Sequence, residues 1–254
     1  MSVPFGRYCG RQKAHLFVPS VLITGVSPKG IGAATALNIA SQSPGLLILA
    51  SRTKARVQEV ASLIDQQYPG TRVEIVLLDL SSQKSIRQAA SEVAVLTDAL
   101  DILINNAGIV VTSRQATPEG IEQQFGTNHI GPFLFTNLLL PLLQKAAQDN
   151  PCGTTRIVTL SSAGHRLSPI RFSDYNFEPK PVPPEEDHVK PLPGAFGKCT
   201  ADGYNGIVTY AQSKTANILF TLYLQQHLSK YGIAAYSLHP GSEFITKMSW
   251  KPSD

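Results

Sequence analysis

Short runs of apolar residues alternate with longer amphipathic stretches from residue 21 to about residue 240. In the runs LLILA, VEIVLL, DILIN and RIVTL nearly every position is apolar, whereas a strand with one exposed face alternates apolar and polar residues. Such runs are typical of parallel strands that helices cover on both faces. The sequence therefore predicts an α/β fold with a doubly wound parallel sheet. We expect strands at about 21–24, 45–50, 72–78, 101–105, 155–161 and 233–238, and helices near 30–42, 53–67, 82–98, 117–147 and 209–231.

Two segments do not follow this alternation. The length of 254 residues suits one α/β domain, and no linker separates two stretches of different composition, so we expect a single domain over residues 1–254. Residues 1–20 form an atypical N-terminal segment of that domain. Residues 165–207 are rich in proline and charge and are too long for a tight connection, which predicts either a surface excursion or a lid beside a site.

Composition narrows the classes of partner and compartment. The formal charge is +4 without a cluster of basic residues, which disfavours nucleic acid as a partner. The three cysteines lack C-x-x-C spacing, so neither a disulfide framework nor a metal site is implied, and a reducing, cytoplasmic location is expected. No stretch has the length and apolar character of a signal sequence or membrane span, so we expect no transmembrane segment.

A glycine-rich loop follows the first predicted strand in VLITGVSPKGIG. Such a loop can present backbone N–H groups and a helix N-terminus to a phosphate. Gly25 and Gly30 match the first half of a mononucleotide-binding pattern, but Ile31 and Gly32 stand where Lys and Ser or Thr should follow. By itself the loop fits either a dinucleotide cradle or an ordinary turn.

The end of the second strand bears on the choice of nucleotide. A protein selective for NAD places an acidic residue here, but this chain has Ser51 and Arg52. Arg52 can pair with a 2′-phosphate, and Lys29 in the glycine loop can add a second positive charge. The alternative is that both are solvated surface cations. The pattern favours NADP(H) over NAD(H).

The third and fourth strands end in polar and small residues. Asp79 can accept a hydrogen bond from an adenine amino group, or it can cap the helix expected near Ser82. The fourth strand ends in INNAG, where small side chains would admit a cofactor and the two asparagines can satisfy the backbone of the loops, although an Asn-rich turn is the alternative. The candidate cofactor-binding residues of this motif are its last four, Asn105, Asn106, Ala107 and Gly108.

Four further residues form a candidate catalytic group. Tyr210 and Lys214 are four residues apart, so they share one face of a helix, and a positive charge is what a phenol needs to act as an acid/base at neutral pH. The strand before them ends at Ser161 and Ser162, where a hydroxyl can donate to a carbonyl oxygen. Asn128 interrupts an apolar helix and either bonds that helix or holds a proton-relay water.

The motifs TGVSPKGIG, DLSS, NNAG, LSS, YAQSK and HPG, taken in order with the helix of Asn128, resemble the short-chain dehydrogenase/reductase superfamily in its single-domain branch. Within that superfamily, the sequence looks most similar to fungal members that resemble retinol dehydrogenases and WW-domain oxidoreductases. The resemblance implies a Rossmann-type fold. It assigns Tyr210 as the acid/base, Lys214 as the group that lowers the pKa of Tyr210 and binds ribose, Ser162 as the carbonyl-orienting hydroxyl, and Asn128 as the relay residue.

The same resemblance implies an NADP(H)-dependent oxidoreductase that moves hydride between nicotinamide and a small carbonyl compound or a primary or secondary alcohol of lipophilic character. It also suggests a homodimer through the helices that carry Asn128 and Tyr210. After HPG the family continues through a covering helix and another strand, so the C-terminal cover is expected to be truncated and the sheet edge uncovered. The alternative function is a catalytically inactive nucleotide-binding or partner-binding protein of the same fold. The expected cofactor-binding residues are Gly25, Lys29, Gly30, Ile31, Gly32, Arg52, Asp79, Asn105, Asn106, Ala107, Gly108, Tyr210, Lys214, Pro240 and Gly241.

Overall fold

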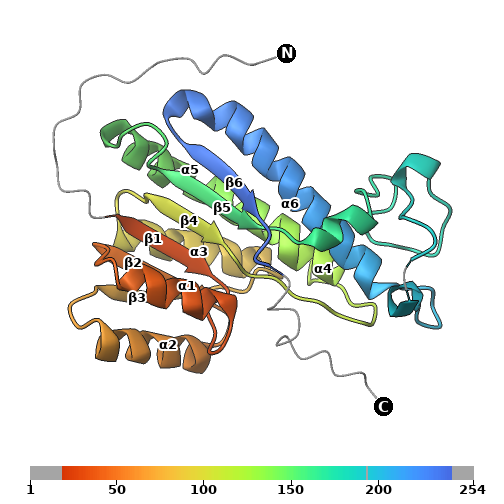
Figure 1. Ribbon diagram of the computed structural model, residues 1–254, viewed down its shortest axis with the longest axis horizontal. Coiled ribbons are helices and arrows are strands. Elements are labelled where there is room, and N and C mark those ends of the chain that lie inside the picture. The colour runs from red at the N-terminus through yellow and green to blue at the C-terminus, as the bar shows by residue number, and fades with distance from the viewer. Residues whose placement is uncertain (1–18, 193, 242–254) are drawn as a thin grey trace.

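One parallel sheet of six strands forms the centre of the protein (Figure 1). A computed structural model describes residues 19–192 and 194–241. The strand order is β3-β2-β1-β4-β5-β6, which places the crossover between the two halves of the sheet beside β1. The predicted doubly wound α/β fold is thereby confirmed. The strands are β1 Ser20–Thr24, β2 Leu46–Ser51, β3 Val73–Leu77, β4 Ile102–Asn105, β5 Arg156–Leu160 and β6 Ala234–Leu238.

Helices bury both faces of the sheet, as the apolar strands require. On β1, Val21 and Ile23 pack into one core with α1 and α2, whereas Leu22 packs into a second core with α3, α5 and α6. Successive side chains of a strand point to opposite faces, so one strand contributes to both cores. The helices are α1 Ile31–Ala40, α2 Lys54–Gln67, α3 Gln83–Leu96, α4 Gln123–Phe125, α5 Gly131–Asp149 and α6 Gly206–Leu228.

The helix predicted over 117–147 is wrong in its first six residues. Residues 117–122 are not helical, and Ala116 pairs with Glu122 in an isolated antiparallel bridge. The short helix α4 then passes through a π-helical turn at Gly126–Ile130 into α5. Close packing fixes this break, because a Cβ on Gly131 would lie 2.3 Å from the carbonyl oxygen of Leu80.

Helix α6 begins three residues earlier than predicted. The Asn205 side chain caps it by accepting hydrogen bonds from the N–H groups of Ile207 and Val208, both at 3.0 Å. At the other end the helix tightens into a 3-10 turn at Ser229–Tyr231, and Gly232 ends it at a φ of 79°. The capping residue therefore sets where the helix starts.

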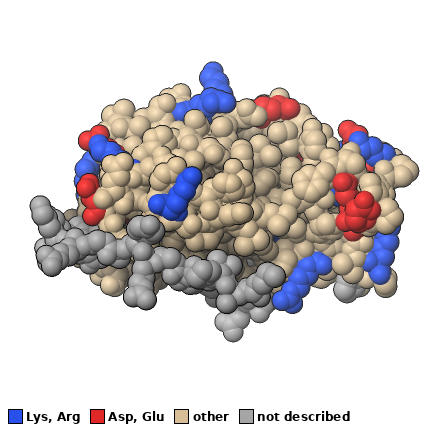
Figure 2. All heavy atoms as spheres, turned by 90° about the horizontal axis from the view of Figure 1, so that it is seen from above, with Lys and Arg blue, Asp and Glu red and all other residues tan. Residues whose placement is uncertain are grey.

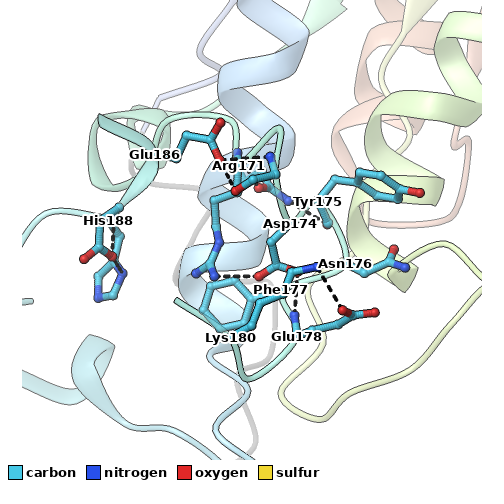
Figure 3. A network of polar contacts seen from close by, with 12 residues as sticks. Arg171, Asp174, Tyr175, Asn176, Phe177, Glu178, Lys180, Glu186 and His188 are labelled. Carbon is cyan, nitrogen blue, oxygen red and sulfur yellow. Dashed lines mark hydrogen bonds and ion pairs between the residues drawn. The ribbon is translucent and has the colours of Figure 1, made fainter. Parts of the chain in front are cut away.

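The first part of the segment 165–207 packs against α6, whereas most residues from 178 to 203 are exposed. Its centre is a buried ion pair between Arg171 and Asp174 at 2.6 Å, and Figure 3 shows the Arg171 side chain aimed at that carboxylate beside the ring of Phe177. The side chain of Gln212, on α6, accepts from the N–H of Arg171 at 2.9 Å and donates to the carbonyl oxygen of Tyr175 at 2.9 Å. The segment is thus anchored to the helix that carries Tyr210.

Two predictions concern residues at the ends of the chain. On β6, Tyr236 and Leu238 are 48% and 49% exposed on the face opposite Ala235, which packs into the core with α6. The expected truncation of the C-terminal cover concerns residues after 241, and most of the atypical N-terminal segment is 1–18, so both lie outside the described residues.

None of the helices in 19–192 and 194–241 combines the length and apolar character that crossing a membrane requires.

Candidate active site

A cleft of about 350 Å³ opens at the carboxyl ends of the central strands. It lies where the strand order reverses, between the loops that follow β1 and β4. This is where open α/β sheets bind ligands. The cleft is lined by Gly25, Ser27, Lys29, Gly30, Ile31, Gly32, Ser51, Arg52, Thr53, Arg56, Leu78, Asp79, Leu80, Asn106, Ala107, Gly108, Ile109 and Thr127.

The glycine loop requires glycine at two of its positions for steric reasons. A Cβ on Gly25 would lie 2.6 Å from the Cα of Ala107, and the φ of Gly25 is 73°. A Cβ on Gly32 would lie 2.7 Å from the side-chain nitrogen of Asn106. The loop is therefore pressed against the NNAG segment, and α1 starts at Ile31 with its first N–H groups beside the cleft.

Three cationic side chains line the cleft, those of Lys29, Arg52 and Arg56. The exposed side chains of Lys29 and Arg52 form no hydrogen bond or ion pair with other described residues. Arg56, in the first turn of α2, lines the same cleft and was missed by the sequence reasoning. The available signal was its position in the first turn of the helix that directly follows the end of β2, close in sequence to Arg52.

Asp79 lines the cleft but does not cap α3. Its carboxylate accepts from the N–H of Ser81 at 2.9 Å and from the hydroxyl of Ser81 at 2.7 Å. The capping residue is Ser82, whose hydroxyl accepts from the N–H of Ser85 at 3.3 Å. The capping alternative for Asp79 is therefore wrong, because its carboxylate stabilises the turn before the helix.

The two asparagines of NNAG have different partners. Asn106 donates to the carbonyl oxygens of Thr24 at 2.7 Å and Gly25 at 3.2 Å, so it satisfies the glycine-loop backbone as predicted. Asn105 does not line the cleft, and its side chain donates to Thr136 on α5 at 2.9 Å. The prediction that Asn105 also satisfies loop backbone is wrong, because successive side chains at a strand end point to opposite faces.

Tyr210, Ser162 and Lys214 come together beyond the end of β5. Tyr210 and Lys214 share one face of α6, with the Lys214 nitrogen 5.6 Å from the centre of the Tyr210 ring. That nitrogen donates to the carbonyl oxygen of Leu160 at 3.0 Å. The hydroxyl of Ser161 donates to the carbonyl oxygen of Lys214 at 2.8 Å, so Ser161 holds the helix and Ser162 faces Tyr210.

Burial is the main influence on the pKa values of Tyr210 and Lys214. It raises the pKa of Tyr210, and the neighbouring Ser162 hydroxyl lowers that pKa in part. It lowers the pKa of the fully buried Lys214 ammonium to about 8. The expected net lowering of the Tyr210 pKa is therefore not seen in this structure, where the loss of hydration outweighs the other influences on the phenol.

Asn128 lies in the π-helical turn and is fully buried. Its side-chain oxygen accepts from the N–H of Ile109 at 2.8 Å, and its nitrogen donates to the carbonyl oxygen of Ile109 at 3.0 Å and to Ser213 at 3.1 Å. A Cβ on Gly108 would meet the Lys214 nitrogen at 3.3 Å and the Asn128 oxygen at 3.5 Å. Asn128 and Lys214 thus meet at the end of the cleft that NNAG lines.

Pro240 and Gly241 are the last described residues and follow β6 directly. Neither lines the cleft. The strand before them is held in place at this edge, because the N–H of Ser161 donates to the carbonyl oxygen of Leu238 at 2.7 Å. Their predicted contact with nicotinamide stays a prediction.

Comparisons with known proteins agree with this geometry. The chain is 36% identical to oxidoreductase fscI of Fusarium equiseti over 234 residues, covering 91% of this chain and 88% of that protein. It is also 36% identical to human retinol dehydrogenase 13 over 91% of this chain, but it spans only 60% of that protein's length. Several other curated relatives, including retinol dehydrogenases 12 and 14 of the mouse, are likewise covered over about 60% of their length.

Solved structures show the same fold. The NADPH-bound carbonyl reductase from chicken fatty liver is 27% identical with a TM-score of 0.62, over 89% of this chain and 80% of that one. A metagenomic short-chain oxidoreductase in complex with NADP, 21% identical, has a TM-score of 0.63 over 91% of this chain and 84% of that one. The family model described as short chain dehydrogenase matches residues 19–176, which include both the glycine loop and Ser162. On this evidence the chain belongs to the short-chain dehydrogenase/reductase family.

Proposed function

We propose that the protein is an NADP(H)-dependent oxidoreductase that interconverts a carbonyl compound and the corresponding alcohol, with Tyr210 as general acid/base. The observation that carries the proposal is the meeting of Tyr210, Ser162 and Lys214 beyond the cleft end lined by Gly108. A phenol, a hydroxyl and an ammonium at one point can bind an oxygen atom and exchange a proton with it.

The residues of the cleft fit a dinucleotide. At Gly25 and Gly32 a Cβ would collide with the NNAG segment, so the loop keeps its backbone close to the cleft, as pyrophosphate binding requires. Lys29, Arg52 and Arg56 would hold the phosphates, and Arg52 and Arg56 together favour a 2′-phosphate. When bound, the nicotinamide supplies or accepts the hydride.

The chain's own residues would handle the oxygen and the proton. In the reducing direction, the Ser162 hydroxyl donates a hydrogen bond to the carbonyl oxygen, and the Tyr210 phenol delivers its proton to the same oxygen. The Lys214 ammonium stabilises the phenolate left behind, because opposite charges attract strongly in a buried site. Asn128 and Lys214 both lie close to Gly108, which supports the proposal that Asn128 holds a water that returns a proton to this pair.

Cofactor binding and turnover test the proposal separately. NADPH fluorescence should rise on binding, with at least about tenfold tighter affinity than NADH, as expected for charge-assisted contacts to a 2′-phosphate. A panel of aldehydes and ketones, including lipophilic ones, should then reveal NADPH oxidation that Tyr210→Phe abolishes while its NADPH affinity stays unchanged. Substantial turnover by Tyr210→Phe would overturn the assignment. Binding of NADPH without turnover of any compound would favour the inactive nucleotide-binding alternative.

The names of relatives bear on the substrate class. Relatives are named retinol dehydrogenases, which supports a lipophilic alcohol or carbonyl compound as substrate. A reducing compartment such as the cytoplasm is proposed on the two described cysteines, Cys152 and Cys199, which are both free thiols. Labelling the native protein with a thiol reagent, before and after reduction, tests that state.

A homodimer through α5 and α6 is also proposed. The only Lys, Arg, Asp or Glu in α6 is the buried Lys214, and Leu222 and Tyr223 of this helix are 60% and 56% exposed. Figure 2 looks at the molecule from the side on which α6 lies in Figure 1 and shows a broad surface with few charges. Two copies can meet on such a surface without like-charge repulsion. Sedimentation should give a dimer that Leu222→Asp converts to a monomer, and a wild-type monomer would refute the proposal.

A further inference from the structure

Two buried amide side chains form a short ladder beside the cleft. Asn128 binds both the N–H and the carbonyl oxygen of Ile109, at 2.8 and 3.0 Å. Gln124, four residues earlier, accepts from the N–H of Val111 at 3.2 Å, and its nitrogen lies 3.5 Å from the carbonyl oxygen of Val111. The two amides thus supply hydrogen-bond partners to backbone groups of the 109–111 segment, which is not part of a strand.

The same two amides also bind α6 on either side of Tyr210. The nitrogen of Gln124 donates to the Thr209 hydroxyl at 2.6 Å, and the nitrogen of Asn128 donates to the Ser213 hydroxyl at 3.1 Å. Figure 1 shows α4, which carries Gln124, lying beside α6. The ladder therefore connects the segment after NNAG with the two residues of α6 that flank the proposed acid/base.

The first turn of α6 packs tightly against the segment after NNAG. A Cβ on Gly206 would lie 2.1 Å from the carbonyl oxygen of Val111. The Gln124 nitrogen also donates to the carbonyl oxygen of Gly206 at 2.8 Å. A change in the Gln124 contacts would therefore shift α6 relative to a segment whose first residue, Ile109, lines the nucleotide cleft.

Buried polar partners fix the orientation of the Gln124 side chain. Its nitrogen lies 3.0 Å from the Tyr204 hydroxyl, and that hydroxyl donates to the Glu122 carboxylate at 2.7 Å. Glu122, Gln124, Tyr204 and Thr209 are each at most 3% exposed. The Val111 N–H faces the oxygen and only acceptors face the nitrogen, which fixes one orientation of the amide. The two hydrogens of the nitrogen serve the two shortest contacts, to the Thr209 hydroxyl at 2.6 Å and the Gly206 carbonyl oxygen at 2.8 Å.

We propose that Gln124 is a positioning residue for the reaction at Tyr210, acting with Asn128 to fix α6 against the 109–111 segment that borders the nucleotide cleft. The inference rests on the proposed function of Tyr210 and adds a residue that touches neither the cleft nor the reacting atoms. A displacement of about 1 Å in reacting groups can lower turnover by about a hundredfold. Loss of the Gln124 contacts should therefore reduce kcat and leave substrate and cofactor binding nearly intact.

The experiment compares Gln124→Met with Gln212→Met. Gln212 is also fully buried, and its amide likewise links α6 to backbone groups of another segment, but it contacts neither the 109–111 segment nor Thr209. Both variants lose a buried amide of the same size, so their thermal unfolding temperatures should fall similarly. For Gln124→Met we expect kcat to fall by about 10- to 100-fold, with KM and the NADPH Kd within about threefold of wild type. For Gln212→Met we expect kcat within about threefold of wild type.

Every outcome decides the inference. A Gln124→Met kcat within threefold of wild type would overturn it, and so would equal losses of kcat in both variants, because that result indicates general destabilisation. If Gln124→Met does not fold, Thr209→Val removes the hydroxyl partner with little change in shape, and it should lower kcat by about three- to tenfold. An unchanged kcat in Thr209→Val would then overturn the proposal.

A separate readout distinguishes this inference from the proposed function. If wild type turns over no carbonyl compound, the proposed function fails first. Absorbance titration of the Tyr210 phenol, isolated by subtracting the Tyr210→Phe curve, then decides the inference without a substrate. Its pKa should differ by at least about half a unit between wild type and the folded Gln124 or Thr209 variant, and not between wild type and Gln212→Met. Equal pKa values in wild type and that variant would overturn the positioning role.

Discussion

Replacing Lys214 with Met should make the protein more stable while removing its activity. The Lys214 ammonium is fully buried and its hydrogen bond in the structure goes to the carbonyl oxygen of Leu160. Burial lowers its pKa from 10.5 to about 8, which corresponds to about 3 kcal/mol against the charged form at pH 7. Met removes this cost, and it also removes a hydrogen bond worth about 1 kcal/mol. We therefore expect Lys214→Met to gain about 2 kcal/mol in the free energy of unfolding at pH 7.

The gain should depend on pH in a direction that follows from the sign of the shift. The pKa of Lys214 is lower in the folded protein than in the unfolded chain, so the unfolded chain binds more protons between about pH 8 and 10.5. Wild-type stability therefore rises with pH through that window, and the Met variant lacks this rise. Its advantage should shrink by about 2 kcal/mol between pH 7 and pH 9.5.

Urea unfolding at pH 7 and pH 9.5 measures both quantities, and NADPH oxidation measures the expected loss of turnover, about 100-fold or more. Lys145→Met is the matched control, because the Lys145 side chain is 56% exposed and lies 3.6 Å from Asp98. That control should change stability by less than about half a kcal/mol at either pH. A Lys214→Met protein less stable than wild type at pH 7, or an advantage independent of pH, would refute the reasoning.

Three further predictions test the nucleotide cleft and the segment 165–207. Gly32→Ala should weaken NADPH binding by at least about tenfold in a fluorescence titration, because its Cβ would lie 2.7 Å from both the Asn106 side chain and the Gly25 carbonyl oxygen. Arg56→Ala should weaken NADPH binding about tenfold and leave NADH binding unchanged, and equal effects on both cofactors would contradict a 2′-phosphate contact. Asp174→Ala should lower the free energy of unfolding by about 3 kcal/mol in urea, because it leaves the buried Arg171 guanidinium without its carboxylate.

The strands were predictable because their signal is local. Each of the six observed strands begins and ends within about one residue of the predicted range, since runs of apolar residues are what burial on both faces requires. The glycine loop and the pairing of Tyr210 with Lys214 were predictable for the same reason, because spacing alone fixes which residues share a turn or a helix face.

What failed depends on contacts between distant segments. The start of the predicted helix at 117 is wrong because Gly126 and Gly131 pack against Thr117 and Leu80, which periodicity does not reveal. The direction in which the Tyr210 pKa shifts could not be predicted from the i, i+4 spacing. That spacing does not show how far the fold removes the phenol from water. Arg56 was missed because an exposed arginine on a helix is most often a solvated surface group.

The role inferred for Gln124 shows why such residues escape local patterns. The hydrogen-bond ladder of β4 ends at Asn105, and the chain beyond it still carries backbone groups that need partners where it runs through the protein. The N–H of Val111 donates to the Gln124 amide, thirteen residues away, and the Thr209 hydroxyl accepts from the same amide across 85 residues. A single side chain thus satisfies the segment bordering the cleft and locates the helix of the proposed acid/base. Loss of the Gln124 amide is therefore expected to change the geometry of both segments at once, a coupling that no spacing in the sequence indicates.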